Sequence, residues 1–228
     1  MFKNIPKPLQ PNDYKYIFTE GIDYLKTGKR SIWGGEDSET SKFLRSAKLR
    51  GRWLHLAAGD GRYNNKLLRT VNTLTASDID KSALAKLWHN TPLQYRRKLT
   101  IKPFNMVKRF PFKNNSFDGL FCMGVLHIFP KSIFRKISAE MKRVLKPGGM
   151  VVIDFATDVR RDRFDGKPYI IKGEPNYTLQ QGKGLLKKVF RDYDIKMRTG
   201  YCPTEANPKA NPPYFFTSKY IVMVATKK

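Results

Sequence analysis

Short apolar runs alternate along the chain with segments in which apolar residues recur every three or four positions. The runs have the length of buried strands and are bounded by small or polar residues. They cover residues 53–57, 73–77, 99–104, 117–123 and 150–155. The clearest helical spacing lies over residues 131–145, where Phe134, Ile137, Met141 and Val144 fall on one face. This alternation predicts an α/β fold with a doubly wound, mostly parallel sheet.

The C-terminal third follows a different pattern, because polar residues and prolines separate its apolar runs. We expect a polar loop, a helix and two strands there, over residues 158–177, 178–190, 193–201 and 214–226. The two strands are joined by a proline-rich loop over residues 203–213. Consecutive strands connected in this way are expected to pair antiparallel.

The first fifty residues precede the strand pattern and are expected to form a helical extension. Asp13 can cap a first helix that ends near Gly28, and a second helix is expected over residues 38–49. We therefore divide the chain into an N-terminal extension, residues 1–50, and a main domain, residues 51–228. Such an extension can pack on the sheet edge or form a lid over a ligand pocket.

A turn of small residues, AAGDG over residues 57–61, separates the first strand from a helical segment. Glycine in such a turn lets a ligand approach the backbone at the carboxyl end of the strand, as nucleotide-like cofactors do. Asp78 ends the second strand, about 20 residues further on, where a carboxylate can accept hydrogen bonds from ribose hydroxyls. The alternative is that Asp78 or Asp80 caps the next helix, and the two roles are compatible if Asp80 is the cap.

The composition excludes several classes of protein. The 228 residues suffice for one domain with a full core, and 40% hydrophobic residues exclude general disorder. No apolar run approaches the roughly 20 residues of a membrane helix, and the N-terminus lacks the apolar core of a secretory signal. Cys122 and Cys202 are too few for a disulfide framework or a cysteine metal site. We expect a cytoplasmic protein without membrane or metal partners.

Positive charge is the unusual bulk property, since 44 Lys and Arg residues face 19 Asp and Glu residues, a formal charge of +25. A field of this sign favours anionic partners, with nucleic acid first, although like charge also keeps a surface soluble. Arg160, Arg161 and Arg163 follow the fifth strand, so we expect them at the ligand-binding edge, in reach of RNA phosphates. The basic run over residues 96–98 should lie at the opposite edge.

Four blocks of the sequence together resemble class I S-adenosylmethionine-dependent methyltransferases. They occur in the family's order and are LHLAAGDGRY, SDIDKSAL, FPFKNNSFDGLFCMGVLHIF and EMKRVLKPGGMVVIDF. The resemblance extends from residue 51 to the C-terminus. It implies a seven-stranded Rossmann-like sheet with its last strand antiparallel, S-adenosylmethionine as cofactor, and transfer of the methyl group from its sulfonium.

The resemblance also implies roles for individual positions. The 57–61 turn would border the methionine moiety, Asp78 would hold the ribose, Asn105 would face the adenine amine, and residues 123–125 would form the floor near the sulfonium. The implied cofactor-binding residues are His55, Ala57, Gly59, Gly61, Asp78, Ile79, Asn105, Met106, Met123 and Val125.

Three of these positions depart from the family pattern. His55 stands where relatives usually carry an acid that orients the cofactor amine, and a neutral imidazole would have to accept that hydrogen bond instead. Ala57 replaces the first glycine of the turn. Asn105 replaces the more frequent Asp, and its amide carbonyl can still accept a hydrogen bond.

His127, just beyond the fourth strand, is the candidate general base, with packing as the alternative role. A base is needed only if the methyl acceptor is protonated when bound, and the remaining requirements are alignment and exclusion of water. The charge favours tRNA or rRNA as acceptor. The alternatives are a small-molecule acceptor and a non-catalytic cofactor-binding subunit. A dinucleotide dehydrogenase is disfavoured, because Asn64 stands where its third glycine would be.

Overall fold

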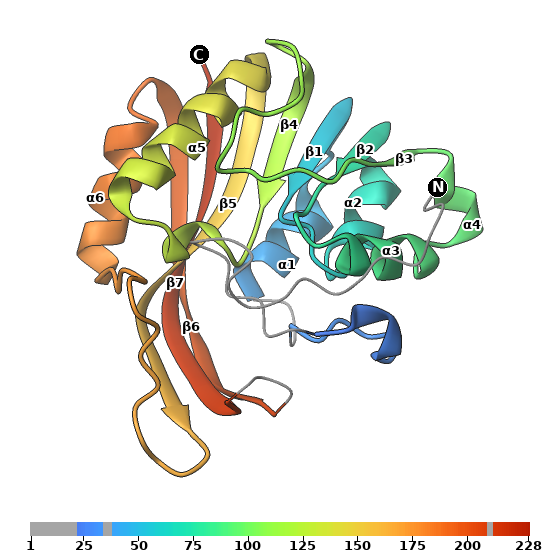
Figure 1. Cartoon of the computed structure of the whole chain (residues 1–228). Helices are drawn as coiled ribbons and strands as arrows, with labels where there is room; N and C mark the ends of the chain where they lie inside the picture. The colour runs from blue at the N-terminus through green and yellow to red at the C-terminus, as the bar shows by residue number, and fades with distance from the viewer. Residues whose placement is uncertain (1–21, 34–37, 209–211) are drawn as a thin grey trace.

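The computed structural model describes residues 22–33, 38–208 and 212–228. Its centre is a seven-stranded sheet in the order β3-β2-β1-β4-β5-β7-β6 (Figure 1). The strands are β1 (Arg52–Leu56), β2 (Thr73–Ala76), β3 (Leu99–Ile101), β4 (Phe117–Cys122), β5 (Leu145–Arg163), β6 (Tyr193–Asn207) and β7 (Tyr214–Lys227). β7 pairs antiparallel with both β5 and β6, whereas the other pairs are parallel. The expected doubly wound sheet with an antiparallel last strand is confirmed.

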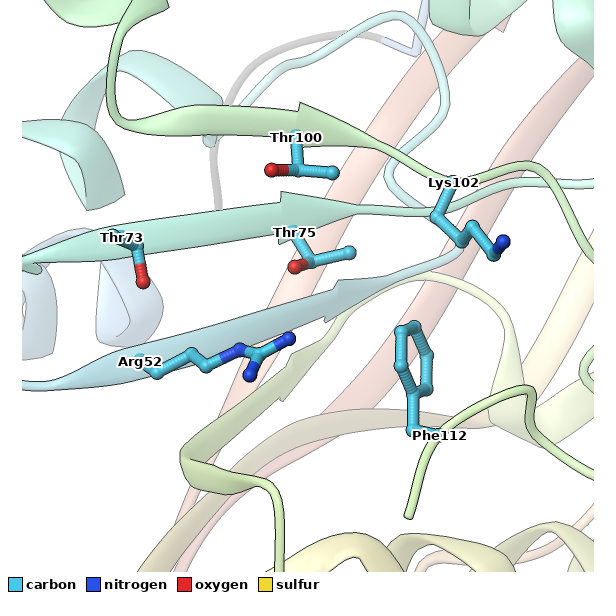
Figure 2. A pocket seen from close by; sticks show the side chains of 6 residues that line it. All are labelled: Arg52, Thr73, Thr75, Thr100, Lys102 and Phe112. Carbon is cyan, nitrogen blue, oxygen red and sulfur yellow. The ribbon is translucent and has the colours of Figure 1, made fainter.

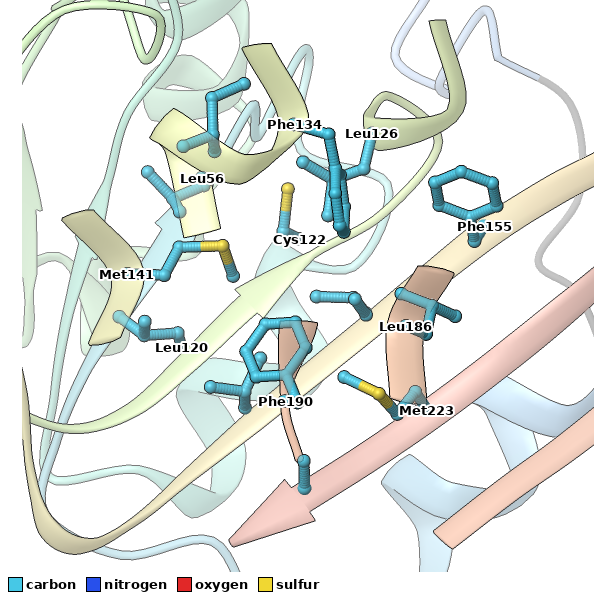
Figure 3. Close-up of a cluster of buried hydrophobic side chains, with 14 of the residues drawn as sticks. Leu56, Leu120, Cys122, Leu126, Phe134, Met141, Phe155, Leu186, Phe190 and Met223 are labelled. Carbon is cyan, nitrogen blue, oxygen red and sulfur yellow. The ribbon is translucent and has the colours of Figure 1, made fainter. Parts of the chain in front are cut away.

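The helices cover the two faces of the sheet, and each face has its own apolar core. They are η1 (Tyr24–Lys26), α1 (Ser38–Ser46), α2 (Asn64–Thr70), α3 (Lys81–His89), α4 (Leu93–Arg96), η2 (Leu126–Ile128), α5 (Lys131–Val144) and α6 (Leu179–Val189). One core lies under α5 and α6, where Phe134, Met141 and Leu186 are fully buried (Figure 3). The other lies under α1, α2 and α3 and includes Trp53 of β1. Helices on both faces follow from strands that are apolar on both sides.

Most of the first expected helix, with its cap Asp13, lies outside the described residues. Over residues 22–28 the structure forms the three-residue η1, capped by Asp23. The second expected helix is present as α1, which ends at Ser46. In the described part of the chain, no helix has the length and apolar character needed to cross a bilayer, and no group of His, Cys, Asp and Glu residues is arranged to bind a metal.

The expectation of a loop directly after residue 157 is wrong, because β5 continues to Arg163 and pairs there with the start of β7. β6 likewise runs beyond Tyr201 to Asn207. The three strands thus extend past the sheet as a ribbon, seen below the sheet in Figure 1. Most of the ribbon's residues are solvent-accessible, so its sequence lacks the apolar signature of a buried strand.

Each outer strand of the ribbon carries an irregularity at the same level of β7. β5 shifts register between Thr157 and Arg160, opposite Ser218, and Asp158 adopts a φ of 49° there. β6 shifts register between Cys202 and Glu205, opposite Thr217. In both places two residues face one residue of β7, which is the pattern of a β-bulge.

No helix occurs between β3 and β4. Residues 102–116 cross to β4 as an irregular segment in which Phe104, Phe110 and Phe112 pack ring against ring at centroid distances of 5.3 and 5.6 Å. The side of β1, β2 and β3 that faces the same way as α5 is therefore covered only in part.

Gly119 of β4 is required by packing, since a Cβ atom there would lie 2.2 Å from the Trp53 ring. We expect Gly119→Ala to destabilise the fold by about 1–3 kcal/mol, the usual range for overpacking. Gly184 on α6 is the matched control, because nothing lies within 4 Å of its added Cβ. Gly184→Ala should stabilise by about 0.5–1 kcal/mol. Urea unfolding measures both, and equal midpoints for the two variants would contradict the packing argument.

Candidate functional site

The turn after β1, residues 57–61, adopts a left-handed backbone at the carboxyl edge of the sheet. The φ angles are 47° at Ala57, 51° at Gly59 and 93° at Gly61. A non-glycine residue is uncommon in this region, so Ala57 is held there by its surroundings. A Cβ atom on Gly61 would lie 2.9 Å from Leu87, so this glycine is also required for packing on α3. The backbone of the turn is thereby fixed close to β2 and α3.

The two acids at the end of β2 have different partners. Asp80 caps α3 by accepting hydrogen bonds from the backbone N–H groups of Ser82 at 2.7 Å and Ala83 at 3.2 Å. Asp78 accepts from Gly59 N at 2.8 Å and from Asp80 N at 3.0 Å, so it joins β2 to the turn. Burial raises the pKa of Asp78 to about 6, although these backbone hydrogen bonds lower it. The expectation that Asp80 caps α3 is confirmed. The binding of a ribose by Asp78 remains a prediction.

A buried ion pair ties the N-terminal segment to the turn. Asp60 accepts hydrogen bonds from Lys86 Nζ at 2.7 Å, Ser31 Oγ at 2.6 Å and Ile32 N at 2.9 Å. Lys86 also donates to Thr27 Oγ1 and to the carbonyl of Arg30, each at 2.8 Å. Sequence analysis missed both charged residues. The available signal was a single lysine within the otherwise uncharged stretch SALAKL of α3.

Tyr24 and Trp33 place aromatic rings beside this ion pair. The ring centroids are 6.5 Å apart, and the Nε1 of Trp33 lies 3.5 Å from the position of a Cβ on Gly59. Burial, and then the nearby carboxylate of Asp78, raise the pKa of Tyr24 well above its usual value. Arg62 donates to the Trp33 carbonyl at 2.9 Å. The segment over residues 22–33 therefore lies against the turn and near Asp78.

His55 is buried near the carboxyl end of β1. Its ring stands edge-on to Phe121 at 5.2 Å, and its Nδ1 has no hydrogen-bond partner. Burial, with a smaller contribution from Arg62, lowers the pKa of His55 to about 3. The imidazole is thus neutral at physiological pH. The unpartnered Nδ1 is an orphaned buried polar atom that a ligand's donor group could satisfy.

The segment after β3 comes next to Asp78, since Phe104 N donates to the Asp78 carbonyl at 3.2 Å. Asn105 follows, and its Oδ1 accepts from Val107 N at 2.9 Å, which fixes the side chain and leaves one lone pair. Ile79, Asn105 and Met106 are all half-buried. The structure thus brings the residues expected around a ribose and an adenine to one part of the edge.

The end of β4 carries the remaining predicted residues. Met123 is buried and its sulfur accepts a hydrogen bond from Thr40 Oγ1 of α1 at 3.8 Å. Val125 is half-buried. His127 in η2 is buried with an unpartnered Nδ1, and burial, then Arg161, lower its pKa to about 3. The ring lies edge-on to Phe155 at 6.5 Å. His127 is therefore a neutral and weak base.

Comparison with known proteins agrees with this geometry. Residues 54–153 match the family model described as a methyltransferase domain. This segment of the chain is therefore similar to methyltransferase domains. No curated protein sequence matches the chain. The expected fold, enzyme class and cofactor, S-adenosylmethionine, are all supported by this domain and its sheet order.

Three solved structures illustrate the similarity of the fold. A putative methyltransferase from Bacillus halodurans is 15% identical, with a TM-score of 0.63 over 84% of this chain and 99% of that one. A DhpI-SAM-HEP complex is 17% identical, with a TM-score of 0.54 over 78% and 82%. A structure reported for the conversion of a disulfide bond into a thioacetal group during echinomycin biosynthesis is 13% identical, with a TM-score of 0.64 over 91% and 89%.

The residues at the edge fit S-adenosylmethionine by their chemistry. The cofactor combines an amino acid with a nucleoside, and the edge offers a left-handed glycine turn beside one unpartnered imidazole nitrogen. The Asp78 carboxylate and the Asn105 amide stand on the neighbouring strand ends. These groups supply the acceptors that an ammonium, ribose hydroxyls and an exocyclic amine require.

Exchanging Asp78 for Ala should weaken cofactor binding far more than Asp80→Ala. Loss of hydrogen bonds to a charged group costs roughly 1.5–3 kcal/mol each, which is about 10- to 150-fold in Kd. Titration calorimetry with S-adenosylmethionine measures the affinities. Asp80→Ala is the matched control, since it removes the α3 cap and should lower the melting temperature with little change in Kd. Equal losses of affinity would show that Asp78 does not anchor the ribose.

Acid should destabilise the fold through the two buried histidines. Both have a folded-state pKa of about 3, below the usual 6.5, so between these values the unfolded chain binds protons that the folded chain does not. Stability therefore falls as pH decreases from 6.5, by up to about 1.4 kcal/mol per pH unit for each histidine. Asp78 opposes this between about pH 6 and 3.8, because its pKa is raised on folding.

Unfolding measured from pH 7 to 5 tests this dependence. His55→Leu and His127→Leu should each lower the slope of the unfolding free energy against pH, by up to the contribution of one bound proton. Gly184→Ala on α6 is the control, because it changes no titratable group and should leave the slope unchanged. If all three variants keep the parent slope, the buried histidines do not cause the acid sensitivity.

Proposed function

We propose that this protein transfers a methyl group from S-adenosylmethionine to RNA, with tRNA and rRNA as the first candidates. The observation that carries the acceptor class is unpaired positive charge on the folded surface of a chain with a formal charge of +25. Exposed basic residues of α5, α6 and the turn after α6 form no ion pair with the described acids: Lys131, Arg135, Lys136, Lys187, Lys188 and Arg191. Such a surface attracts phosphate groups without regard to sequence, so its charge alone does not show where the acceptor binds.

The arginines expected to guide RNA are largely neutralised by neighbouring acids. Arg161 is nearly buried, forms a two-pronged ion pair with Glu174 at 2.7 and 2.9 Å, and lies over the rings of Tyr214 and Phe216. Arg160 pairs with Asp162 and Arg163 approaches Asp165. Arg161 therefore stabilises the ribbon, and the phosphate contacts are better sought elsewhere.

Methyl transfer requires the protein mainly to bind the cofactor and the acceptor and to orient them. S-adenosylmethionine, when bound, supplies a methyl group activated by its positively charged sulfur. Asp78 would accept hydrogen bonds from the ribose hydroxyls. His55 Nδ1 would accept one from the amino group of the cofactor, and Asn105 would accept one from the adenine amine. The N-terminal extension, acting as a lid through Tyr24 and Trp33, would exclude water from this edge.

His127 is the proposed base where the acceptor is protonated. Its unpartnered Nδ1 can accept a proton from a hydroxyl or amine that reaches it, although the low pKa makes it a weak base. An unprotonated, pyridine-type ring nitrogen of a nucleobase already has a free lone pair and needs no base. This difference makes a nucleobase nitrogen the acceptor best suited to the site.

A small-molecule acceptor is the second candidate. The observation in its favour is the similarity to the structure from echinomycin biosynthesis, which covers 91% of this chain. Proteins of this fold with 13% identity differ freely in their acceptors, so the charge distribution weighs more in our proposal.

Incubation with methyl-labelled S-adenosylmethionine and fractionated cell extract tests the function. We expect label in the RNA fraction, removed by ribonuclease, and lost at least tenfold with Asp78→Ala but retained with Asp80→Ala. Label confined to small molecules would show that the acceptor is a small molecule and not RNA. Cofactor binding with no labelled product in any fraction would point to a non-catalytic cofactor-binding subunit.

A further inference from the structure

The sheet has an open polar face that the methyl-transfer site does not use. Arg52 pairs with Thr73 across β1 and β2, and Thr75 pairs with Thr100 across β2 and β3, so these four side chains share one face. Their neighbours Trp53 and Leu74 point to the opposite, buried face. Central parallel strands are usually apolar on both faces because helices cover both. The hydroxyl and guanidinium groups here match the absence of a helix between β3 and β4.

This open face is a hollow of about 340 Å³, lined by Arg52, Thr73, Thr75, Thr100, Lys102 and Phe112 (Figure 2). The size is within the lower range of ligand pockets, about 300–1,000 Å³. In Figure 2 the side chains of Lys102 and Phe112 stand at one end of the hollow, and Arg52 extends along its side from the other end. Phe112 also lines a second hollow of about 630 Å³, which includes Arg109, Lys113 and Arg143. The two hollows therefore form neighbouring parts of one surface.

Most basic side chains of this surface form no ion pair, although Glu140 lies within electrostatic range of Arg109. Neither hollow is lined by an acid, and Arg52, Lys102, Arg109 and Lys113 form no ion pair with the acids of the described residues. The Arg52 guanidinium lies over the Phe117 ring at 4.9 Å, which orients it without using its N–H groups. Arg143 is different, since Glu140 and three oxygens of the 102–116 segment occupy it.

The combination of groups selects a ligand class. Cations spaced along a surface bind successive phosphates, threonine hydroxyls can bond to sugar and phosphate oxygens, and an accessible aromatic ring stacks on an unpaired base. A duplex hides its base faces, so it cannot use the ring. Lys102 directly follows β3, three residues before Asn105, so the surface leads to the edge that carries the cofactor residues.

We infer that this face binds a single-stranded segment of RNA, with phosphates on Arg52, Lys102, Arg109 and Lys113 and a base against Phe112. The inference rests on the proposed RNA acceptor and gives it a docking surface separate from the methyl-transfer site. It accounts for where the acceptor is held, which the overall charge does not.

Fluorescence anisotropy with a labelled single-stranded RNA of about 12 nucleotides tests the inference over a series of salt concentrations. The groove variant combines Lys102→Gln, Arg109→Gln and Lys113→Gln, all at exposed side chains. We expect at least a tenfold loss of affinity at low salt, and a log–log salt slope lower by about 0.7 for each lost contact, or about 2 in all. The matched control removes the same charge from exposed side chains at α1 and α2, on the other face of the sheet, with Arg45→Gln, Lys48→Gln and Arg69→Gln. It should change neither the affinity nor the salt slope by more than twofold.

Phe112→Leu separates stacking from charge, because it should weaken binding severalfold while leaving the salt slope unchanged. Its melting temperature is compared with that of the parent, since Phe112 also packs on Phe104 and Phe117. Equal losses in the groove and control variants, undiminished binding by the groove variant, or no salt-dependent binding by the parent would each overturn the inference. Duplex RNA that binds as tightly as the single strand would overturn it as well.

Methyl transfer is measured in parallel, so the two proposals fail separately. If the groove variant methylates and binds RNA like the parent, the docking surface is wrong and the RNA acceptor stands. If the parent binds RNA through this face but labels only small molecules, the docking surface stands and the acceptor is wrong.

Discussion

The buried ion pair between Lys86 and Asp60 is the interaction on which the shape of the site depends. Both side chains are almost fully removed from water, which is costly for charges unless every donor and acceptor is satisfied. Lys86 has three N–H donors, and they go to Asp60, Thr27 and the Arg30 carbonyl. One ammonium group thus joins α3, the turn after β1 and the N-terminal segment. Removing a single partner of such a pair typically costs about 3–5 kcal/mol.

The charge of the protein is organised rather than uniform. In the ribbon each arginine of β5 has an acid beside it, so the ribbon is nearly neutral although the chain is strongly basic. On the open face and along α5 and α6 most exposed basic side chains lack such partners, with Lys142 and Arg143 as the exceptions. Because nearby opposite charges cancel the field at a distance, an approaching polyanion would experience the helices and the open face and scarcely the ribbon.

Much of the fold follows from the sequence, because buried strands and amphipathic helices repeat an apolar residue at fixed intervals. α5, with Phe134, Ile137 and Met141 inward, was predictable for this reason, as were β1 and the positions of Asp78 and Asn105. The ribbon was not, since main-chain pairing holds strands whose side chains mostly face water. Asp60 and Lys86 were missed because their contact spans 26 positions and a charged residue is normally expected at the surface. The environment of His55 and His127 likewise exists only after folding.

The paired bulges of the ribbon have a consequence for the order of side chains along its strands. Side chains alternate along a strand, so one extra residue shifts by one the sequence positions that face inward and outward beyond it. β5 and β6 each carry one such residue opposite neighbouring positions of β7, Ser218 and Thr217. Beyond the bulges both strands pair again with β7, which passes this level without an extra residue, so the ribbon keeps the two faces of the sheet. The alternation along β5 or β6 changes phase at the bulges in sequence but not in space.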